Sequence, residues 1–503
     1  LALQAAAPTR ARPLPLRYYA VADDSAHPEV RQALELALGP LPGWRPDPLD
    51  QVTEQARPDT WEDDTGLCLA EAEQRSLGAG SAAGGAAAGD GDAGRPASVP
   101  GAGAAPYHQQ RSPLAGRCNV WNLLWSWSVK ARPPLSELLV WQRVNHFPEA
   151  RQLTRKDLLK KHLMMHGGHA RLGPLFSCLP TTWVLPKEHS AAADALLRAC
   201  MGVEPSVTQP AGLNLWIAKP VCLSRGRGIR LVRSLRELEA GPGGSGSSDN
   251  PLVLQRYVTN PLTVQRAVGA ACCQGYKFDL RLYVLVTRFN PLEAWLCSEG
   301  LARFATLPFN LDESNFSNRF IHLTNSSVQR SRAEGGQVPH FLASAQPSGG
   351  SKLSFAQLRP LLVAQGVDWP QLWARITDVV TTCLFVAQDA IPACVNAFEL
   401  FGFDVLVDTS GTVWLLEVNS SPSLSLGTPL DRTLKPKMVR DAIAIVDPLS
   451  FDRDALAEVL SRRTIPRKYG EALHQVGPEP NWFTCIAPSP LLDKLTKLRK
   501  PIG

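Results

Sequence analysis

The chain has 503 residues, of which 44% are hydrophobic and 19% charged, a length and composition typical of about two to four globular domains or lobes. Its net charge of +6 fits an acidic partner, whether nucleic acid, an acidic protein tail or phosphates, without choosing among them. No apolar run reaches the length of a membrane helix, and the eleven cysteines lack any zinc spacing, which favours free thiols in a reducing compartment.

A low-complexity segment divides the first part of the chain. Residues 16–21 predict a short strand and residues 28–38 a helix. Residues 76–106 are rich in Gly, Ala, Ser and Pro and cannot bury enough apolar surface to offset the cost of ordering, so we expect a disordered insertion over residues 45–117. Proline and arginine break the opening residues too early for a signal peptide, and the start at Leu1 leaves open whether other residues precede it.

Order resumes with a strand-like run at residues 119–125. The sequence Asn-His-Phe-Pro at residues 145–148 then interrupts the chain. A helix is expected to begin at Thr154, with Arg-Lys-Asp at residues 155–157 in its first turn.

A glycine loop follows between two predicted strands within residues 215–232. Gly226 and Gly228 would allow backbone N–H groups to approach an anion, while Lys219 and Arg225 supply positive charge. The loop is not a Walker loop, because it lacks Gly-Lys-Ser/Thr and leads into a strand. A bare Gly-x-Gly is equally typical of a hairpin turn, so this stretch alone does not establish a phosphate site.

A charged strand comes next. Period-two alternation places Lys277, Asp279 and Arg281 on one face of a strand at residues 276–283. Three ionised residues on one face indicate either a solvated sheet edge or the charged floor of an active site. The alternating signs favour neither interpretation over the other.

Residues 397–419 predict a β-hairpin with glycine in its turn. If the loop consists of Ser410 and Gly411, Asp404 lies directly across from Glu417. Two carboxylates about 5 Å apart repel each other and need a counter-charge. Mg²⁺ would supply it, with Asn419 as a third oxygen ligand.

Two alternatives to this metal site remain open. One carboxylate could face solvent while the other pairs with a lysine or arginine. A three-residue loop would shift the strand register and break the pairing between Asp404 and Glu417. Alternation also places Leu415 on the same face as Glu417.

The fold class that these elements predict is α+β. A lysine before a glycine loop, a strand ending in Gln255-Arg256-Tyr257, a charged strand and a carboxylate hairpin follow one another in the order of an ATP-grasp fold, in which two or three α+β lobes close on ATP-Mg. We expect these parts: residues 1–44 and 118–185, an N-terminal lobe in two pieces; 45–117, the insertion; 186–260, a central lobe; 261–447, a C-terminal lobe with a disordered insertion at 333–350; and 448–503, a basic tail with a short amphipathic helix at 491–500.

Residue for residue, the chain resembles the tubulin tyrosine ligase-like family, and within it the tubulin polyglutamylase branch. The resemblance covers residues 16–447 apart from the insertions. The motifs that carry it are residues 145–148 (NHFP), 155–157 (RKD), 216–220 (WIAKP), 224–229 (SRGRGI), 255–257 (QRY), 277–281 (KFDLR), 300–306 (GLARFAT), 322–325 (HLTN), 401–404 (FGFD) and 416–422 (LEVNSSP).

The resemblance implies a role for each motif. Adenine would be held by Gln255, Tyr257 and Val258, with Tyr257 and Val258 acting through their backbone, and the neighbouring Arg256 would also contact ATP. The rest of ATP would be held by Lys156, Lys219, Arg225, Gly226, Gly228, Ile229, Lys277, Asp279, Thr324 and Asn325. Mg²⁺ would be held by Asp404, Glu417 and Asn419, and Glu417 would also be catalytic. The incoming amino acid or the acyl-phosphate would meet Arg281, Arg303, Ser327 and Lys435.

The activity implied is that of an ATP-dependent acid–amino-acid ligase, with ATP and Mg²⁺ as cofactors, that joins free L-glutamate to glutamate side chains of tubulin C-terminal tails. A monomer without nucleic-acid or membrane partners is expected, in the cytoplasm and cytoskeleton, including the axoneme or basal body of a cilium or flagellum. The alternatives are a glycine ligase of the same family and a non-catalytic microtubule-binding protein.

Overall fold

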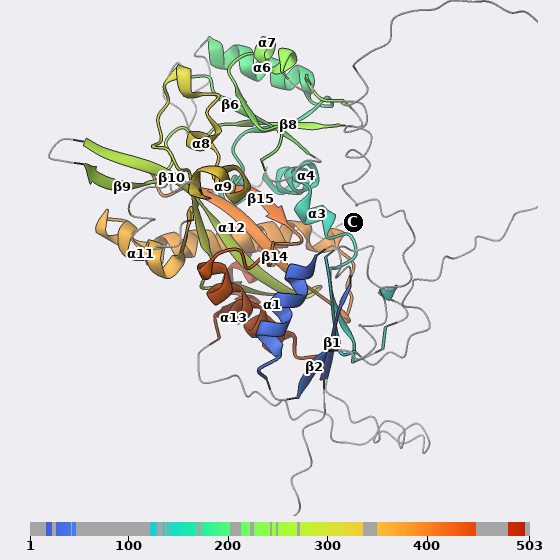
Figure 1. Ribbon diagram of the computed structural model, residues 1–503. Helices are drawn as coiled ribbons and strands as arrows, with labels where there is room; N and C mark the ends of the chain where they lie inside the picture. Colours follow the sequence, from blue (N-terminus) through green and yellow to red (C-terminus); the bar gives the residue numbers. More distant parts are fainter. Residues whose placement is uncertain are drawn as a thin grey trace, which may run out of the picture.

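The computed structural model describes residues 17–46, 121–201, 213–334, 350–448 and 481–497, with short gaps inside these ranges (Figure 1). Most of the expected insertions, from residue 47 to 117 and from 335 to 349, lie outside the described residues. Within the described part, strands form one large and one small sheet, and no helix is long and apolar enough to cross a membrane.

The large sheet has the order β13-β12-β10-β14-β4-β3-β1-β2, to which β15 is added on β14, β9 and β11 on β10, and β16 on β11. Its centre is β10, which pairs in turn with β9, β12, β14 and β11. Its strands are β1 (Arg17–Ala22), β2 (Trp44–Pro46), β3 (Leu123–Ser126), β4 (Arg143–Asn145), β9 (Thr263–Val268), β10 (Cys272–Phe289), β11 (Leu292–Cys297), β12 (Leu301–Phe304), β13 (Lys352–Ser354), β14 (Ala397–Val407), β15 (Val413–Asn419) and β16 (Phe483–Ala487).

Helices cover both faces of the large sheet. One face packs against α12, while the other carries α1 and α13, which contact each other. Alternation along β10 decides which face of the sheet each side chain enters. Phe278, Leu280 and Leu282 enter the core on the side of α12, and Tyr283 and Leu285 enter the core on the side of α1 and α13. The helices on this sheet are α1 (Pro28–Leu38), α3 (Arg151–Thr154), α4 (Lys156–Gly167), α5 (Gly173–Phe176), α11 (Phe355–Ala364), α12 (Trp369–Ala387), α13 (Pro429–Val446) and α15 (Pro490–Lys497).

The small sheet has the antiparallel order β5-β8-β6-β7 and lies above the large sheet in Figure 1. Helices α6 (His189–Cys200) and α7 (Leu235–Ala240) pack on one of its faces. Its strands are β5 (Thr182–Leu185), β6 (Trp216–Pro220), β7 (Arg230–Val232) and β8 (Leu252–Arg256). The lobe boundary expected at residue 186 is therefore wrong by one strand, because β5 hydrogen-bonds to β8.

The connection between β12 and β13 bridges the two sheets. It contains the short helices η5 (Glu313–Asn315) and α8 (Arg319–His322), followed by α9 (Ser326–Glu334). Phe309 and Phe316 from this connection pack against a separate apolar cluster that contains Ile217 of β6. A further short helix, η6 (Gln388–Ala390), follows α12.

The C-terminal residues include a strand that the sequence analysis missed. Residues 448–503 were expected to form a tail, but Phe483–Ala487 pairs with β11 as β16. The amphipathic helix expected at 491–500 is confirmed as α15, which places Leu492 and Leu495 in the main core. This segment therefore completes an edge of the sheet.

Candidate active site

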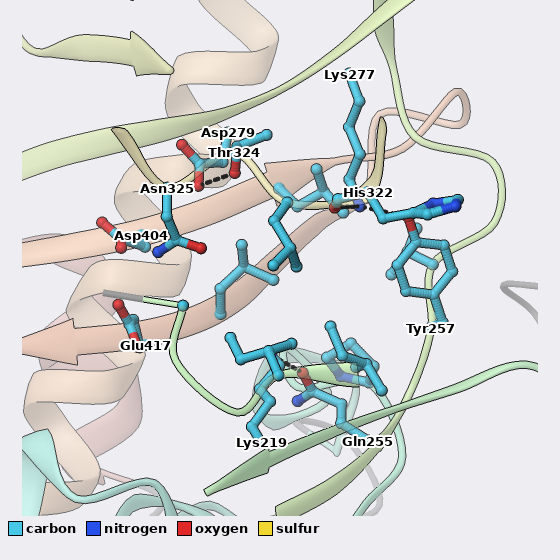
Figure 2. Close-up of a pocket in the computed structure, with 18 of the residues that line it drawn as sticks. Lys219, Gln255, Tyr257, Lys277, Asp279, His322, Thr324, Asn325, Asp404 and Glu417 are labelled. Atoms are coloured by element: carbon cyan, nitrogen blue, oxygen red, sulfur yellow. Dashed lines mark hydrogen bonds between the residues drawn. The ribbon is translucent and has the colours of Figure 1, made fainter. Parts of the chain in front are cut away.

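A cavity with an empty volume of about 850 Å³ lies between the two sheets (Figure 2). Residues from β6, β8, β10, β12, β14, β15, α4 and the segment around α8 line it. The predicted site residues among them are Lys156, Lys219, Gly226, Ile229, Gln255, Arg256, Tyr257, Val258, Lys277, Asp279, Arg303, Thr324, Asn325, Asp404 and Glu417.

The other predicted residues lie elsewhere. Arg281 and Asn419 do not line the cavity but contact Asp404 and Glu417, which do. Three more are not brought to the cavity wall: Gly228 is in the glycine loop, Ser327 is exposed on α9, and Lys435 is buried on α13. Arg225 lies outside the described residues.

The hairpin of β14 and β15 pairs Asp404 with Glu417, as predicted, although the turn differs from the one expected. Near the turn Val407 pairs with Val413, and the N–H of Asp408 donates to the carbonyl of Thr412 at 3.0 Å. The loop is therefore the three residues 409–411, and the expected two-residue loop is wrong. A β-bulge between Asp404 and Val405 then inserts one extra residue in β15 and restores the predicted pairing.

The bulge also changes which side chains face the cavity. Leu415 enters the main core, so its predicted place on the face of Glu417 is wrong. Leu416 lines the cavity beside Glu417 instead. Two successive residues therefore contribute to the same wall, which regular alternation does not allow.

A row of charged side chains crosses three strands, β12, β10 and β14, on the floor of the cavity. Register pairs Arg303 of β12 with Asp279 of β10, and Arg281 of β10 with Asp404 of β14. Arg303 donates to both oxygens of Asp279, at 2.6 and 2.5 Å, and its Nη2 lies 2.7 Å from Asp404 Oδ2. Arg281 Nη2 donates to the same oxygen at 3.0 Å.

These side chains are buried, which answers the question left open by the sequence. Asp279, Arg303 and Asp404 have relative exposures of 3%, 8% and 1%. Burial alone would lower the pKa of Arg303, but Asp279 and Asp404 outweigh it and hold that pKa well above its usual value. The strand face is the floor of a site, and the solvated edge is excluded.

Glu417 has its own cationic partner. Lys156 Nζ, at the start of α4, lies 3.0 Å from Glu417 Oε2, and its positive charge lowers the pKa of that carboxyl below the usual value. The pairing of carboxylates with basic side chains, the alternative to a metal, is thus observed for both Asp404 and Glu417.

The same residues still fit a Mg²⁺ ion. Among the described residues no group of three or more His, Cys, Asp and Glu side chains could hold a metal. The predicted set combines two carboxylates with an amide, and Asn419 Nδ2 lies 3.4 Å from Glu417 Oε1. Three oxygen-bearing side chains thus meet on neighbouring strands beside a cavity, which is the donor chemistry that Mg²⁺ prefers.

The wall formed by the small sheet carries a buried lysine. Lys219 Nζ donates to Gln255 Oε1 at 2.7 Å, and Gln255 Nε2 donates to the hydroxyl of Thr182 at 2.9 Å. Burial lowers the pKa of Lys219 to about 8, and the positive charge of Lys156 adds to this effect. In Figure 2 Lys219 lies below the cavity, next to Gln255.

The opposite end of the cavity contains His322, which the sequence analysis did not predict as a site residue. Lys277 Nζ donates to the hydroxyl of Tyr257 at 2.8 Å and to the carbonyl of His322 at 3.0 Å. The Tyr257 hydroxyl lies 3.0 Å from His322 Nδ1, and His322 Nε2 lies 3.1 Å from the carbonyl oxygen of Asn315.

Burial sets the charge state of this group. It lowers the pKa of Lys277 to about 7 and that of His322 to about 4, so His322 is neutral at pH 7. In the neutral ring, Nε2 of His322 therefore carries the hydrogen and donates it in a hydrogen bond to the carbonyl oxygen of Asn315. Nδ1 accepts a hydrogen bond from the hydroxyl of Tyr257. The signal for His322 was its place next to Thr324 and Asn325, both of which line the cavity.

The backbone of Tyr257 is partly engaged within the protein. Its N–H donates to the carbonyl of Leu215 at 3.0 Å. A backbone contact from Tyr257 to a ligand would therefore use its carbonyl oxygen. Val258 follows directly and also lines the cavity.

Comparison with known proteins gives a family match and several relatives. The model of the tubulin-tyrosine ligase family matches residues 134–455. Over 328 residues the chain is 35% identical to the probable tubulin polyglutamylase TTLL2 of Homo sapiens, a match that covers 65% of this chain and 50% of that protein. Over 341 residues it is 35% identical to the tubulin polyglutamylase TTLL5 of Mus musculus, covering 65% of this chain and 23% of that one.

A third relative has a related activity in its name. The tubulin monoglutamylase TTLL4 of Homo sapiens is 32% identical over 341 residues, which cover 66% of this chain and 25% of that protein. The chain thus spans half or less of the length of these three relatives. The two sheets around one cavity form the α+β, ATP-grasp-like fold that the sequence predicts.

Proposed function

Because this chain belongs to the tubulin-tyrosine ligase family, we propose that it is an ATP-dependent ligase that attaches glutamate, through an isopeptide bond, to glutamate side chains in the C-terminal tails of tubulin. The names of its relatives support the substrate. The observation that carries the chemistry is the charged floor: Asp404 and Glu417 lie on paired strands, surrounded by lysine and arginine, in a cavity between the two sheets.

ATP would lie across the cavity from the Tyr257 end to the Glu417 end. The adenine would meet Gln255, Tyr257 and Val258, and the phosphates would meet Lys156 and Lys219. Lys219 is buried beside Gln255 and therefore has few positions available, so it would bind phosphate with little further loss of side-chain freedom.

Asp404, Glu417 and Asn419 would hold Mg²⁺. When bound, the ion would neutralise phosphate charge and help to align the terminal phosphate. Lys156 would give up its contact with Glu417 and move to the phosphates, since the two partners of the ion pair each have a new partner in the complex.

The reaction has two steps. A carboxylate oxygen of the acceptor attacks the γ-phosphorus of ATP, forms an acyl-phosphate and releases ADP. The amino group of free glutamate then attacks the acyl carbon, forms the amide bond and releases phosphate and a proton. Arg281 and Arg303 would stabilise the negative charge on the acyl-phosphate, because Asp279 and Asp404 already fix their guanidinium groups.

The incoming amino acid would bind near α13. Lys435 Nζ donates to the carbonyl of Ser425 at 2.5 Å and lies 3.0 Å from Asp431 Oδ1, and its charge would attract the carboxylate of glutamate. Burial lowers the pKa of Lys435 to about 8, so it is mostly protonated at pH 7. Ser327 would contribute a hydroxyl.

The test is incubation of the purified protein with tubulin, ATP, Mg²⁺ and either labelled glutamate or labelled glycine, followed by intact-mass measurement of the tails. Glutamate incorporation is expected, and incorporation of glycine alone would replace this proposal with a glycine ligase. Glu417→Gln should abolish incorporation, whereas Glu239→Gln, at an exposed site, should not. No incorporation of either amino acid would favour a non-catalytic microtubule-binding protein. With tubulin as acceptor, we further propose a cytoplasmic place on microtubules, including those of cilia.

A further inference from the structure

Arg319 lies outside the motifs that the sequence analysis singled out. Its side chain contacts a backbone atom of the cavity wall. It opens α8, where Asn318 accepts a hydrogen bond from the N–H of Phe320 as the N-cap. Its Nη2 donates to the carbonyl oxygen of Gly226 at 2.6 Å. Gly226 lines the cavity, so an arginine from the large-sheet side holds a wall residue of the small-sheet side.

Gly226 is enclosed on a second side by residues that follow α8. Its φ of +75° is in the region that favours glycine. A Cβ at this position would lie 2.8 Å from Val328 Cγ2 and 3.2 Å from Asn325 Oδ1. The backbone at Gly226 therefore touches α9 while its carbonyl is held by Arg319.

The contact fixes a direction as well as a position. In a planar trans peptide the C=O and N–H groups point in opposite directions. Holding the carbonyl of Gly226 on Arg319 therefore also sets the direction of the N–H of the next residue, Arg227. Gly228 has a φ of +67°, and successive N–H groups in such a loop bind anions only when their directions are set.

A neighbouring ion pair joins the same two segments more weakly. Arg233 Nη1, after β7, lies 2.8 Å from Glu313 Oε1 of η5, and its guanidinium lies 5.6 Å from the centre of the Phe316 ring. The side chains of Arg233 and Glu313 are 40% and 78% exposed, so this pair contributes little. Arg319 differs because it acts on a peptide group that forms part of the cavity.

We propose that Arg319 is a positioning residue for the nucleotide: it holds the Gly226 peptide so that the wall formed by Gly226, Ile229 and Asn325 keeps the shape that binds the phosphates. This rests on the proposed function only in that a nucleotide occupies the cavity. Arg319 does not touch the reacting groups, so its removal should weaken nucleotide binding without slowing the chemical step.

The test measures binding and turnover separately in Arg319→Met, Arg319→Lys and the control Arg330→Met, an exposed arginine on α9. Binding is measured by titration with a fluorescent ATP analogue and Mg²⁺, and turnover by glutamate incorporation. Arg319→Met should raise the Kd of the analogue and the KM for ATP by about tenfold, as expected for loss of one charged hydrogen bond. The kcat and the KM for glutamate should not change, and Arg319→Lys should recover part of the loss.

Each other outcome counts against the inference in a recognisable way. Unchanged analogue binding by Arg319→Met, or an equal loss in Arg330→Met, would overturn it while leaving the proposed function intact. A loss in kcat alone would mean that Arg319 acts in the chemistry. If Arg319→Met is less stable to heat, the binding measurement on Arg319→Lys decides the question, because this variant keeps the positive charge and the aliphatic part of the side chain. Recovery of part of the binding by Arg319→Lys would support the inference. No binding of the analogue by the unsubstituted protein would overturn the nucleotide site itself.

Discussion

Lys156 and Glu417 form an ion pair, with Nζ and Oε2 3.0 Å apart, that joins the start of α4 to the second strand of the hairpin. Both residues are assigned to other partners in the proposed complex, Lys156 to phosphate and Glu417 to Mg²⁺. The pair therefore competes with ligand binding and makes the two events depend on each other.

Lys156→Met should separate metal binding at Glu417 from phosphate binding at Lys156. Without Lys156 the carboxylate of Glu417 has lost its competing cation, so Mn²⁺ alone should bind up to about fivefold more tightly, which corresponds to an ion pair of about 1 kcal/mol. ATP should bind more weakly, because a phosphate contact is lost. Mn²⁺ titration followed by electron paramagnetic resonance measures the first effect. Weaker Mn²⁺ binding would show that Lys156 does not compete with the ion.

Nucleotide binding should take up protons above pH 8. The pKa of Lys219 is about 8 because burial disfavours its charged form, and a phosphate next to Nζ would raise that pKa. Calorimetric titration with ATP in buffers of different ionisation enthalpy measures the uptake. Lys219→Met should bind more weakly and show less uptake. Equal uptake in the two proteins would assign the proton to another group.

The buried Lys277 predicts a pH dependence of stability. Its pKa is about 7 in the folded protein, against about 10.4 in an unfolded chain, so between these values the unfolded state binds more protons. The contribution of Lys277 to the free energy of unfolding therefore rises with pH in this window, by at most about 1.4 kcal/mol per pH unit. Urea unfolding of the protein and of Lys277→Met between pH 7 and 10 measures the difference, and a difference that falls with pH would contradict the buried position.

Glu399 should be important for stability. Its exposure is 0%; it lies 3.0 Å from His146 Nδ1 and accepts from the N–H of Phe147 at 2.9 Å. Removing one partner of a buried pair costs about 3–5 kcal/mol, so Glu399→Ala should lower the free energy of unfolding by that amount.

The chain contains a matched control for this effect. Glu29 pairs with His27 at 3.4 Å, with both side chains about a quarter exposed. Glu29→Ala should cost about 1 kcal/mol or less. Equal losses in urea unfolding for the two variants would show that burial does not govern the Glu399 pair.

Gly411→Ala tests the three-residue turn. Gly411 has a φ of +75°, and a Cβ there would overlap Arg375 Nη1, which donates to the carbonyl of Gly411. The substitution should lower the free energy of unfolding by about 1 kcal/mol or more. Gly366→Ala is the control for conformation alone, because its φ is +85° but a Cβ would meet no atom within 4 Å. Equal effects would mean that Arg375 moves aside freely.

Much of the site followed from the sequence because its residues occur in motifs whose local geometry is regular. Alternation correctly placed Lys277 and Asp279 on the same wall, and the motifs brought Lys219 and Gln255 to the cavity. The pair of Asp404 and Glu417 was predicted from a wrong loop length, and the bulge that compensates leaves no signature in a run such as Leu-Leu-Glu.

Other features depend on partners far away in the chain. Strand β16 forms because β11, nearly two hundred residues earlier, offers an edge at Leu292–Cys297, and no local pattern reports such an edge. In the sequence, His322 looks like part of a polar connection. Its partners Tyr257 and Lys277 lie beside it only in the folded protein. The contact from Arg319 to Gly226 uses a backbone carbonyl, which every residue has, so the sequence carries no sign of it.

Six charged groups in and beside the floor of the cavity balance one another, since the cations Lys156, Arg281 and Arg303 pair with the anions Asp279, Asp404 and Glu417. Lys219 is a further cation on the cavity wall. A polyanion that arrives there gains no overall attraction from these six groups. A nucleotide that brings its own divalent ion presents both signs of charge. The ion can take the place of Lys156 beside Glu417, and a phosphate can take the place of Glu417 beside Lys156. In the proposed complex, we therefore expect the nucleotide to enter already bound to its metal.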